Sequence, residues 1–165
     1  MGLTSKLFLL FVVCITFQAA FAWPHFSISK WTDVGYDINR AADDVERDIR
    51  KDLLNTKNKI WKETSKIINK GRFDESAIDC IVEKQVEQLE LLDRTFVEAR
   101  ECIDNVRSEV NAITSEGRPE LIMLKNKFKN QVKDCRNNSK DVFKTSQKVF
   151  QQNAMICTST PRERE

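Results

Sequence analysis

The chain has 165 residues, of which 32% are charged, and its 27 basic and 25 acidic side chains give a formal net charge of +2. A balance so close to zero argues against a nucleic-acid-binding protein, because such proteins usually carry a net basic footprint. Four glycines and three prolines among abundant, interspersed charges favour long helices over sheets.

The N-terminal segment 1–22 has the pattern of a secretory signal peptide. Lys6 provides a positive charge, residues 7–17 form an apolar run, and Ala20-Phe21-Ala22 has the small-x-small pattern of a cleavage site. The apolar run is shorter than the about 20 residues that span a bilayer. We therefore expect a secreted, extracellular protein that begins at Trp23 and forms one domain over residues 23–165.

Glycine and proline divide the mature chain into three helical segments. The helix-breaking positions are Gly71, Gly117-Arg118-Pro119 and Pro161. Such residues are typical of helix ends. Asp74 or Ser76 is expected to cap the second helix. The predicted helices cover about residues 32–70, 74–114 and 119–157, and a short polar tail follows at 158–165.

Apolar residues recur at helical spacing in all three segments. The expected core positions of the first are Val34, Ile38, Ala42, Val45, Ile49, Leu53, Ile60 and Ile67, with Trp61 and Ile68 beside them. Those of the second are Ile78, Val82, Gln85, Leu89, Leu92, Phe96, Ala99, Ile103, Val106, Val110 and Ile113. Those of the third are Leu121, Leu124, Phe128, Val132, Cys135, Val142, Val149 and Ile156, with Phe143 and Phe150 beside them. These stripes predict coiled-coil packing, and the short links predict an all-α, elongated, antiparallel up-down-up three-helix bundle.

Some members of these stripes admit a second interpretation. Gln85, Ser139, Ser146 and Asn153 are polar, and they mark either a gap that accepts a ligand or a device that fixes helix register. Trp23, Trp31 and Trp61 are candidates for lining a ligand site. We favour core packing for Trp61, because it adjoins Ile60 on the apolar stripe.

Four cysteines remain after removal of the signal peptide, an even number typical of two disulfides in a small secreted protein. The positions of Cys80 and Cys157 sum to 237, as do those of Cys102 and Cys135, so both pairs are centred on the turn near Pro119. Pairing within one helix would separate the partners by about 33 Å, whereas a disulfide needs Cα atoms within about 7 Å. A crossed pairing would need two different hairpin centres. We therefore predict the disulfides Cys80–Cys157 and Cys102–Cys135.

The second and third helices carry opposite charge. Residues 74–101 contain nine acidic and three basic side chains, and residues 120–148 contain eight basic and three acidic ones. The mirror relation about the turn predicts that Asp93 faces Lys144 and that Glu101 faces Arg136. We interpret the basic face as neutralising the neighbouring helix, in preference to a site for nucleic acid or anionic lipid.

No arrangement of residues indicates catalysis, a metal or a cofactor. The single histidine, His25, lies outside the predicted bundle, and there is no zinc-ligand spacing, P-loop or dinucleotide-binding motif. We therefore expect a protein that is not an enzyme and has no cofactor. Asn137-Asn138-Ser139 is a sequon, which makes Asn137 a candidate N-glycosylation site.

The cysteines Cys80, Cys102, Cys135 and Cys157, in a helical stretch that covers residues 74–156 behind a signal peptide, resemble the TsetseEP-domain family of small insect secreted proteins. The resemblance covers roughly half of the chain. It implies an extracellular insect protein, from gut or a secretory gland, with no assigned activity and no site residues. The family's founding member adds a tail of Glu-Pro repeats, and this chain has none.

The expected function is that of a secreted, non-enzymatic interaction module, a rigid rod whose polar faces bind another protein, a glycan or a microbial surface. The alternative is a carrier for a small hydrophobic ligand. Its expected site is the space that Ser139, Ser146 and Asn153 leave beside Phe143 and Phe150. We expect no nucleic acid partner, and no stable membrane insertion, because the disulfides prevent the second and third helices from separating. The protein is expected as a monomer or homodimer.

Overall fold

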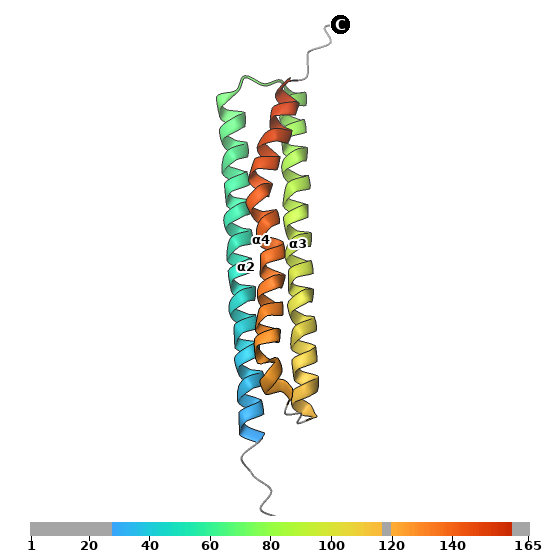
Figure 1. Ribbon diagram of the computed structural model, residues 1–165. Helices are drawn as coiled ribbons and strands as arrows, with labels where there is room; N and C mark the ends of the chain where they lie inside the picture. The colour runs from blue at the N-terminus through green and yellow to red at the C-terminus, as the bar shows by residue number, and fades with distance from the viewer. Residues whose placement is uncertain (1–27, 117–119, 160–165) are drawn as a thin grey trace, which may run out of the picture.

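The computed structural model describes residues 28–116 and 120–159, which form three helices (Figure 1). α2 spans Ile28–Lys70, α3 spans Glu75–Ser115 and α4 spans Glu120–Ser159. The three predicted helices are confirmed, and α2 begins about one turn earlier than expected. The predicted signal peptide, Trp23, His25, the turn at 117–119 and the end of the tail lie outside the described residues.

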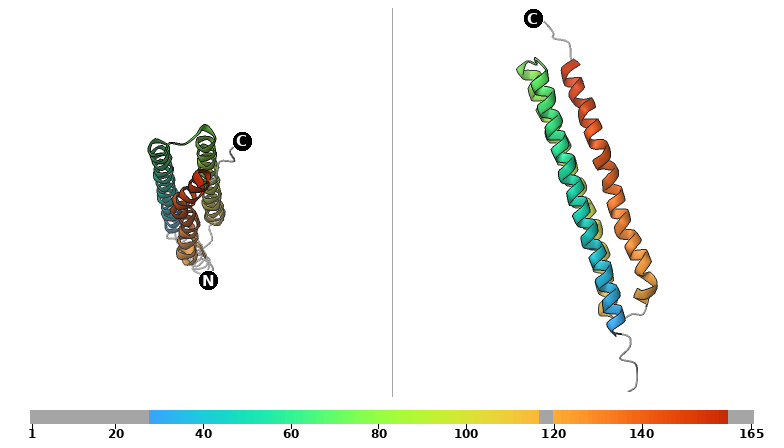
Figure 2. Two further views of the ribbon diagram at one scale, coloured as in Figure 1. Left: turned by 90° about the horizontal axis from the view of Figure 1, so that it is seen from above. Right: turned by 90° about the vertical axis from the view of Figure 1, so that its left-hand side faces the viewer.

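The helices run up, down and up along one long axis, and each packs against both others (Figures 1 and 2). α2 and α4 are therefore parallel, and α3 is antiparallel to both. The disulfides Cys80–Cys157 and Cys102–Cys135 join α3 to α4 with Cα–Cα distances of 5.7 and 5.8 Å. The predicted fold class and both predicted disulfides are confirmed.

The link between α2 and α3 depends on its own residues. The Gly71 N–H donates to the Ile67 carbonyl at 3.1 Å, which closes the last turn of α2. A Cβ added to Gly71 would lie 1.9 Å from the Phe73 ring, so the absence of a side chain lets Phe73 fold over the helix end. The Asp74 carboxylate accepts the Ala77 N–H at 2.9 Å, which makes Asp74 the N-cap of α3.

The core changes in character along the rod. In the part formed by α2 up to residue 53, α3 from residue 99 and α4 up to residue 135, the buried side chains are apolar. They are Ile38, Ala42, Ile49, Leu53, Ala99, Ile103, Val106, Val110, Leu121, Phe128, Val132 and Cys135. We call this part the apolar half and the remainder of the rod the polar half. The buried polar residues described all lie in the polar half, and they are Thr56, Thr64, Gln85, Gln88, Thr95, Ser139 and Ser146.

Some predicted core positions are wrong. Val82, Val149 and Ile156 are exposed, and Ile81, Phe150 and Cys157 are buried next to them. The cause is visible in the spacing of the buried positions, which includes two successive steps of four residues. In α3 these steps lead from Thr95 to Ala99 and on to Ile103. They interrupt a strict seven-residue repeat and rotate the buried face.

The interpretation of Trp61 as a core residue is also wrong. Its side chain is 56% exposed, whereas the neighbouring Ile60 is fully buried. At this level the buried face of α2 is formed by Thr56, Ile60 and Thr64, and it does not extend to Trp61. The two threonine hydroxyls donate to the carbonyls of Asp52 and Ile60, four residues earlier, and so tolerate burial. The Trp31 side chain lies outside the described residues.

Candidate anion-binding groove between α2 and α4

Ion pairs connect α2 to both neighbouring helices. Lys57 contacts Asp93 of α3 at 2.6 Å, and Arg136 of α4 contacts Asp48 at 3.1 Å. The predicted facing pairs, Asp93 with Lys144 and Glu101 with Arg136, are therefore wrong. The mirror relation between α3 and α4 gives the level of a residue along the rod but not the side of the helix on which it lies. Asp93 and Arg136 both face α2.

Between α2 and α3, Arg107 is the centre of the largest ion-pair cluster. Its guanidinium contacts Asp43 at 2.5 Å, Glu46 at 3.2 Å and Asp104 at 2.8 Å. Burial lowers the pKa of Arg107, but the hydrogen bonds to Asp104 and Glu46 and the nearby carboxylates outweigh burial, so the pKa is raised overall. This cluster fixes α2 against α3 in the apolar half.

Between α2 and α4, a row of cations follows the side of α4 that faces α2. As far as Arg136, acidic residues of α2 pair with members of this row. Lys125 contacts Asp37 at 2.6 Å, and Arg136 contacts Asp48 at 3.1 Å and Asp52 at 3.8 Å. The hydrogen bond and charge of Lys125 lower the pKa of Asp37, and more distant cations add to the effect. Here the basic face of α4 is paired with acidic residues of α2, whereas the prediction named the second helix, α3, as the partner.

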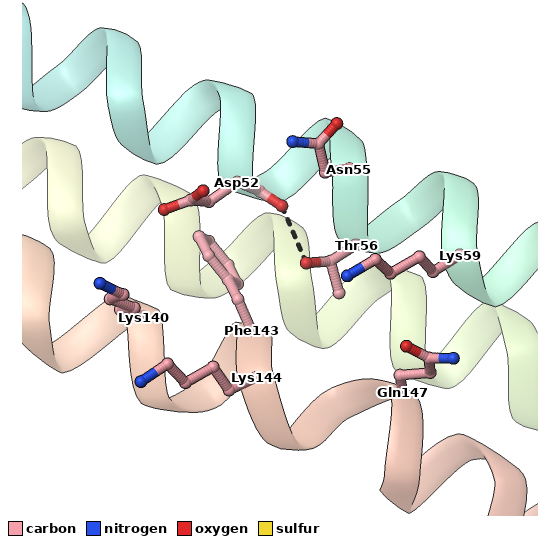
Figure 3. Close-up of a pocket in the computed structure, with 8 residues that line it drawn as sticks. All are labelled: Asp52, Asn55, Thr56, Lys59, Lys140, Phe143, Lys144 and Gln147. Atoms are coloured by element: carbon pink, nitrogen blue, oxygen red, sulfur yellow. Dashed lines mark hydrogen bonds between the residues drawn. The ribbon is translucent and has the colours of Figure 1, made fainter.

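Beyond Asp52 the acidic residues of α2 on this side give way to Asn55, Thr56 and Lys59, whereas the cation row of α4 continues with Lys140 and Lys144. A groove of about 270 Å³ lies between the two helices at this level (Figure 3). Its lining residues are Asp52, Asn55, Thr56, Lys59, Lys140, Phe143, Lys144 and Gln147.

Three of these residues are lysines that come from both walls of the groove. Lys140 and Lys144 extend from α4 and Lys59 from α2, and the Phe143 ring stands between the helices (Figure 3). Within residues 28–116 and 120–159, none of the three forms an ion pair. The one acidic lining residue, Asp52, already contacts Arg136 at 3.8 Å, and Glu63, further along α2, contacts Lys66 at 3.7 Å. Three lysines and one carboxylate therefore line the groove, which has an excess of positive charge.

The remaining lining side chains add hydrogen-bonding groups. Asn55 and Gln147 carry amides that both donate and accept, and the Thr56 hydroxyl is occupied by the Asp52 carbonyl at 2.8 Å. The lining includes no cysteine, serine or histidine. The arrangement of lysines and amides is suited to holding an anion.

A second groove, of about 180 Å³, lies between α3 and α4 next to the disulfide Cys102–Cys135. Ser139 and Val142 border it, and Glu98 is its one charged residue. The other residues predicted to leave space for a hydrophobic ligand do not line it. Ser146 is buried and donates to the Val142 carbonyl at 2.7 Å, and Phe150 is fully buried.

Asn137, the candidate glycosylation site, is exposed on α4. In the part of the chain that the structure describes, no cluster of histidine, cysteine and acidic side chains is arranged to hold a metal ion. Nor does any described helix combine the length and apolar character needed to cross a membrane.

Sequence reasoning did not identify Lys59, Lys140 and Lys144 as a group. The signal was present, because Lys140 and Lys144 are one turn apart and the acidic residues of α2 on this side end at Asp52 while the cations of α4 continue. Finding the group requires the parallel register of α2 against α4. Comparing the charges of α3 and α4 gives no information on how α2 aligns with α4.

Comparison with known proteins gives no match to this chain among family models, curated proteins or solved structures. The resemblance to TsetseEP-domain proteins therefore stays a prediction.

Proposed function

We propose that this protein is a secreted, non-enzymatic binding module that holds an extracellular partner on its outer helix faces, chiefly on the groove between α2 and α4. The observation that carries the proposal is the convergence of Lys59, Lys140 and Lys144 on a groove that has one acidic lining residue, Asp52. That carboxylate already contacts Arg136 at 3.8 Å. Like charges four residues apart on a helix, as Lys140 and Lys144 are, disfavour folding by a few tenths of a kcal/mol. An external anion would remove that repulsion.

The helical scaffold is suited to binding a partner without a conformational change. Two disulfides hold α4 to α3, and the ion pairs of Arg107 and Arg136 hold α2 to α3 and to α4. Because α2 also packs along both other helices, the two walls of the groove are already formed, and a partner does not have to order them on binding. Disulfides of this kind persist in oxidising compartments, which supports an extracellular location together with the predicted signal peptide and the insect family resemblance.

The alternative, a carrier of a small hydrophobic ligand, has one observation in its favour. The groove beside Cys102–Cys135 has only one charged lining residue. Its volume of about 180 Å³ is too small to enclose a typical small ligand, which takes about 300–1,000 Å³. A partner bound on an open helix face, as in the first function, does not have to be enclosed. We therefore place this function second.

Native mass spectrometry, without reductant, of protein purified from its own source separates the two functions. The binding module predicts a monomer or homodimer of residues 23–165, lighter by the hydrogens lost at two disulfides, with or without a glycan and with no apolar cargo. A discrete additional mass that dissociates on gentle activation and proves to be a lipid or sterol would replace the proposal with the carrier.

A further inference from the structure

We propose that the groove between α2 and α4 binds a linear anionic polysaccharide. Sulfate or carboxylate groups would contact Lys59, Lys140 and Lys144, and sugar hydroxyls would contact the amides of Asn55 and Gln147. This inference rests on the proposed function and names the ligand class of the same groove.

The charge pattern supports an anionic ligand. Two cations of α4 that face α2, Lys125 and Arg136, are paired with carboxylates of α2, which are Asp37, Asp48 and Asp52. From Asp52 onward α2 presents Lys59 across from Lys140 and Lys144, so the same row meets a cation. Positive charges that converge across a groove attract anions and raise their local concentration.

The shape of the site supports a linear ligand. The groove lies between two parallel helices, and its lysines are arranged along the rod (Figure 3). Lys140 and Lys144 are about 6 Å apart along the helix axis, because each residue rises about 1.5 Å. Successive charged groups of a polymer can therefore occupy successive lysines. A single small anion would contact only some of the three lysines.

The neutral side chains favour a saccharide over the other polyanions. Asn55 and Gln147 match the donors and acceptors of sugar hydroxyls. Single-stranded nucleic acid needs exposed aromatic rings for base stacking, and the one aromatic residue of the groove, Phe143, is 4% exposed. Binding at a membrane surface needs exposed apolar side chains beside the cations. The exposed Leu54 and Trp61 of α2 are not among the lining residues.

The test uses the mature, disulfide-bonded chain and a heparin-derived hexasaccharide as the probe, with binding measured by titration calorimetry. The K59Q/K140Q/K144Q variant removes the three groove charges and keeps side chains of good helix propensity. The K70Q/R94Q/K127Q variant is the matched control, because it removes the same charge from exposed positions outside the groove. Circular dichroism spectra and melting curves establish that both variants fold.

We expect the groove variant to bind about thirtyfold more weakly, because an exposed ion pair accounts for about a threefold change per lysine. The control should change affinity by less than about twofold, and wild-type affinity should fall as ionic strength rises. The single variant K144Q, with about a threefold loss, provides the test if the triple variant does not fold.

Three results would overturn the inference. The first is that the hexasaccharide does not bind. The second is that both triple variants lose affinity equally. The third is that single-stranded DNA, or anionic phospholipid vesicles, bind the groove more tightly than the hexasaccharide. If the hexasaccharide does not bind and native mass spectrometry shows no bound lipid or sterol, the polysaccharide is refuted as the ligand, and the proposal of a binding module is unaffected. A bound lipid would refute the binding module itself.

Discussion

Replacing Gln85 with methionine is expected to stabilise the protein. Gln85 lies in the core of the polar half, is 3% exposed, and its side-chain Nε2 has no hydrogen-bond partner. An amide N–H that loses water on folding and gains no acceptor is unfavourable in the native state. Methionine has a similar unbranched length, so it removes the amide without leaving a cavity.

The magnitude follows from the unsatisfied group. Leaving a buried polar group without a partner costs about 1–3 kcal/mol. We therefore expect Gln85→Met to raise the free energy of unfolding by about 2 kcal/mol, the middle of that range. For a chain of this size that corresponds to roughly 6 °C in Tm. Gln88, whose Nε2 is also without a partner, should respond in the same direction.

The assay is equilibrium unfolding in guanidinium chloride without reductant, with the midpoint shifting and the slope unchanged. Thr95→Val is the control, because the Thr95 hydroxyl already donates to the Leu91 carbonyl at 2.9 Å. Its effect should remain within about 1 kcal/mol of wild type. A Gln85→Met variant that is no more stable than wild type would show that the amide has a hydrogen-bond partner in the native state and would contradict this prediction.

Three further predictions concern the contacts that hold the helices together. Replacing both Cys102 and Cys135 with alanine should lower the free energy of unfolding by about 3–4 kcal/mol, because the bond joins residues separated by 33 positions; the readout is Tm without reductant. Arg107→Met should cost about 1–2 kcal/mol by removing the hydrogen bonds to Glu46 and Asp104, because Glu46 then keeps only longer contacts, to Arg50 and Arg100; hydrogen exchange should accelerate in α2 near Glu46. The pKa of Asp37 is lowered in the folded state, so its contribution to stability is present at neutral pH and is lost as pH falls through the folded-state pKa. Asp37→Asn should therefore lower stability at neutral pH, and the difference from wild type should shrink as the pH falls toward about 2 and the carboxylate is protonated; a constant difference from pH 7 to 2 would contradict this.

The sequence predicted the fold well because the strongest constraints are covalent and periodic. The positions of the four cysteines about one turn determine which residues of α3 and α4 lie at the same level, and both disulfides follow from that relation. Gly71 and Asp74 mark a helix end and a helix start by the chemistry of their own backbone and side chain.

The sequence predicted the side-chain environment less well. A stripe of apolar residues does not show where the buried face rotates, so Ile81 was missed and Val82 was assigned to the core. Charge content alone does not show which neighbour a charge faces, so Asp93 was paired with the wrong helix. The groove depends on both properties, because Lys59 and Lys144 are 85 residues apart and meet only in the parallel register of α2 and α4.

A ¹⁵N–¹H NMR titration of the mature, disulfide-bonded protein with the heparin-derived hexasaccharide would locate the binding site on the helices. Binding in the groove predicts saturable shifts of the backbone amides at 52–59 in α2 and 140–147 in α4, with α3 unaffected. Shifts spread over all three helices, or concentrated on α3, would contradict a binding site formed by Lys59, Lys140 and Lys144.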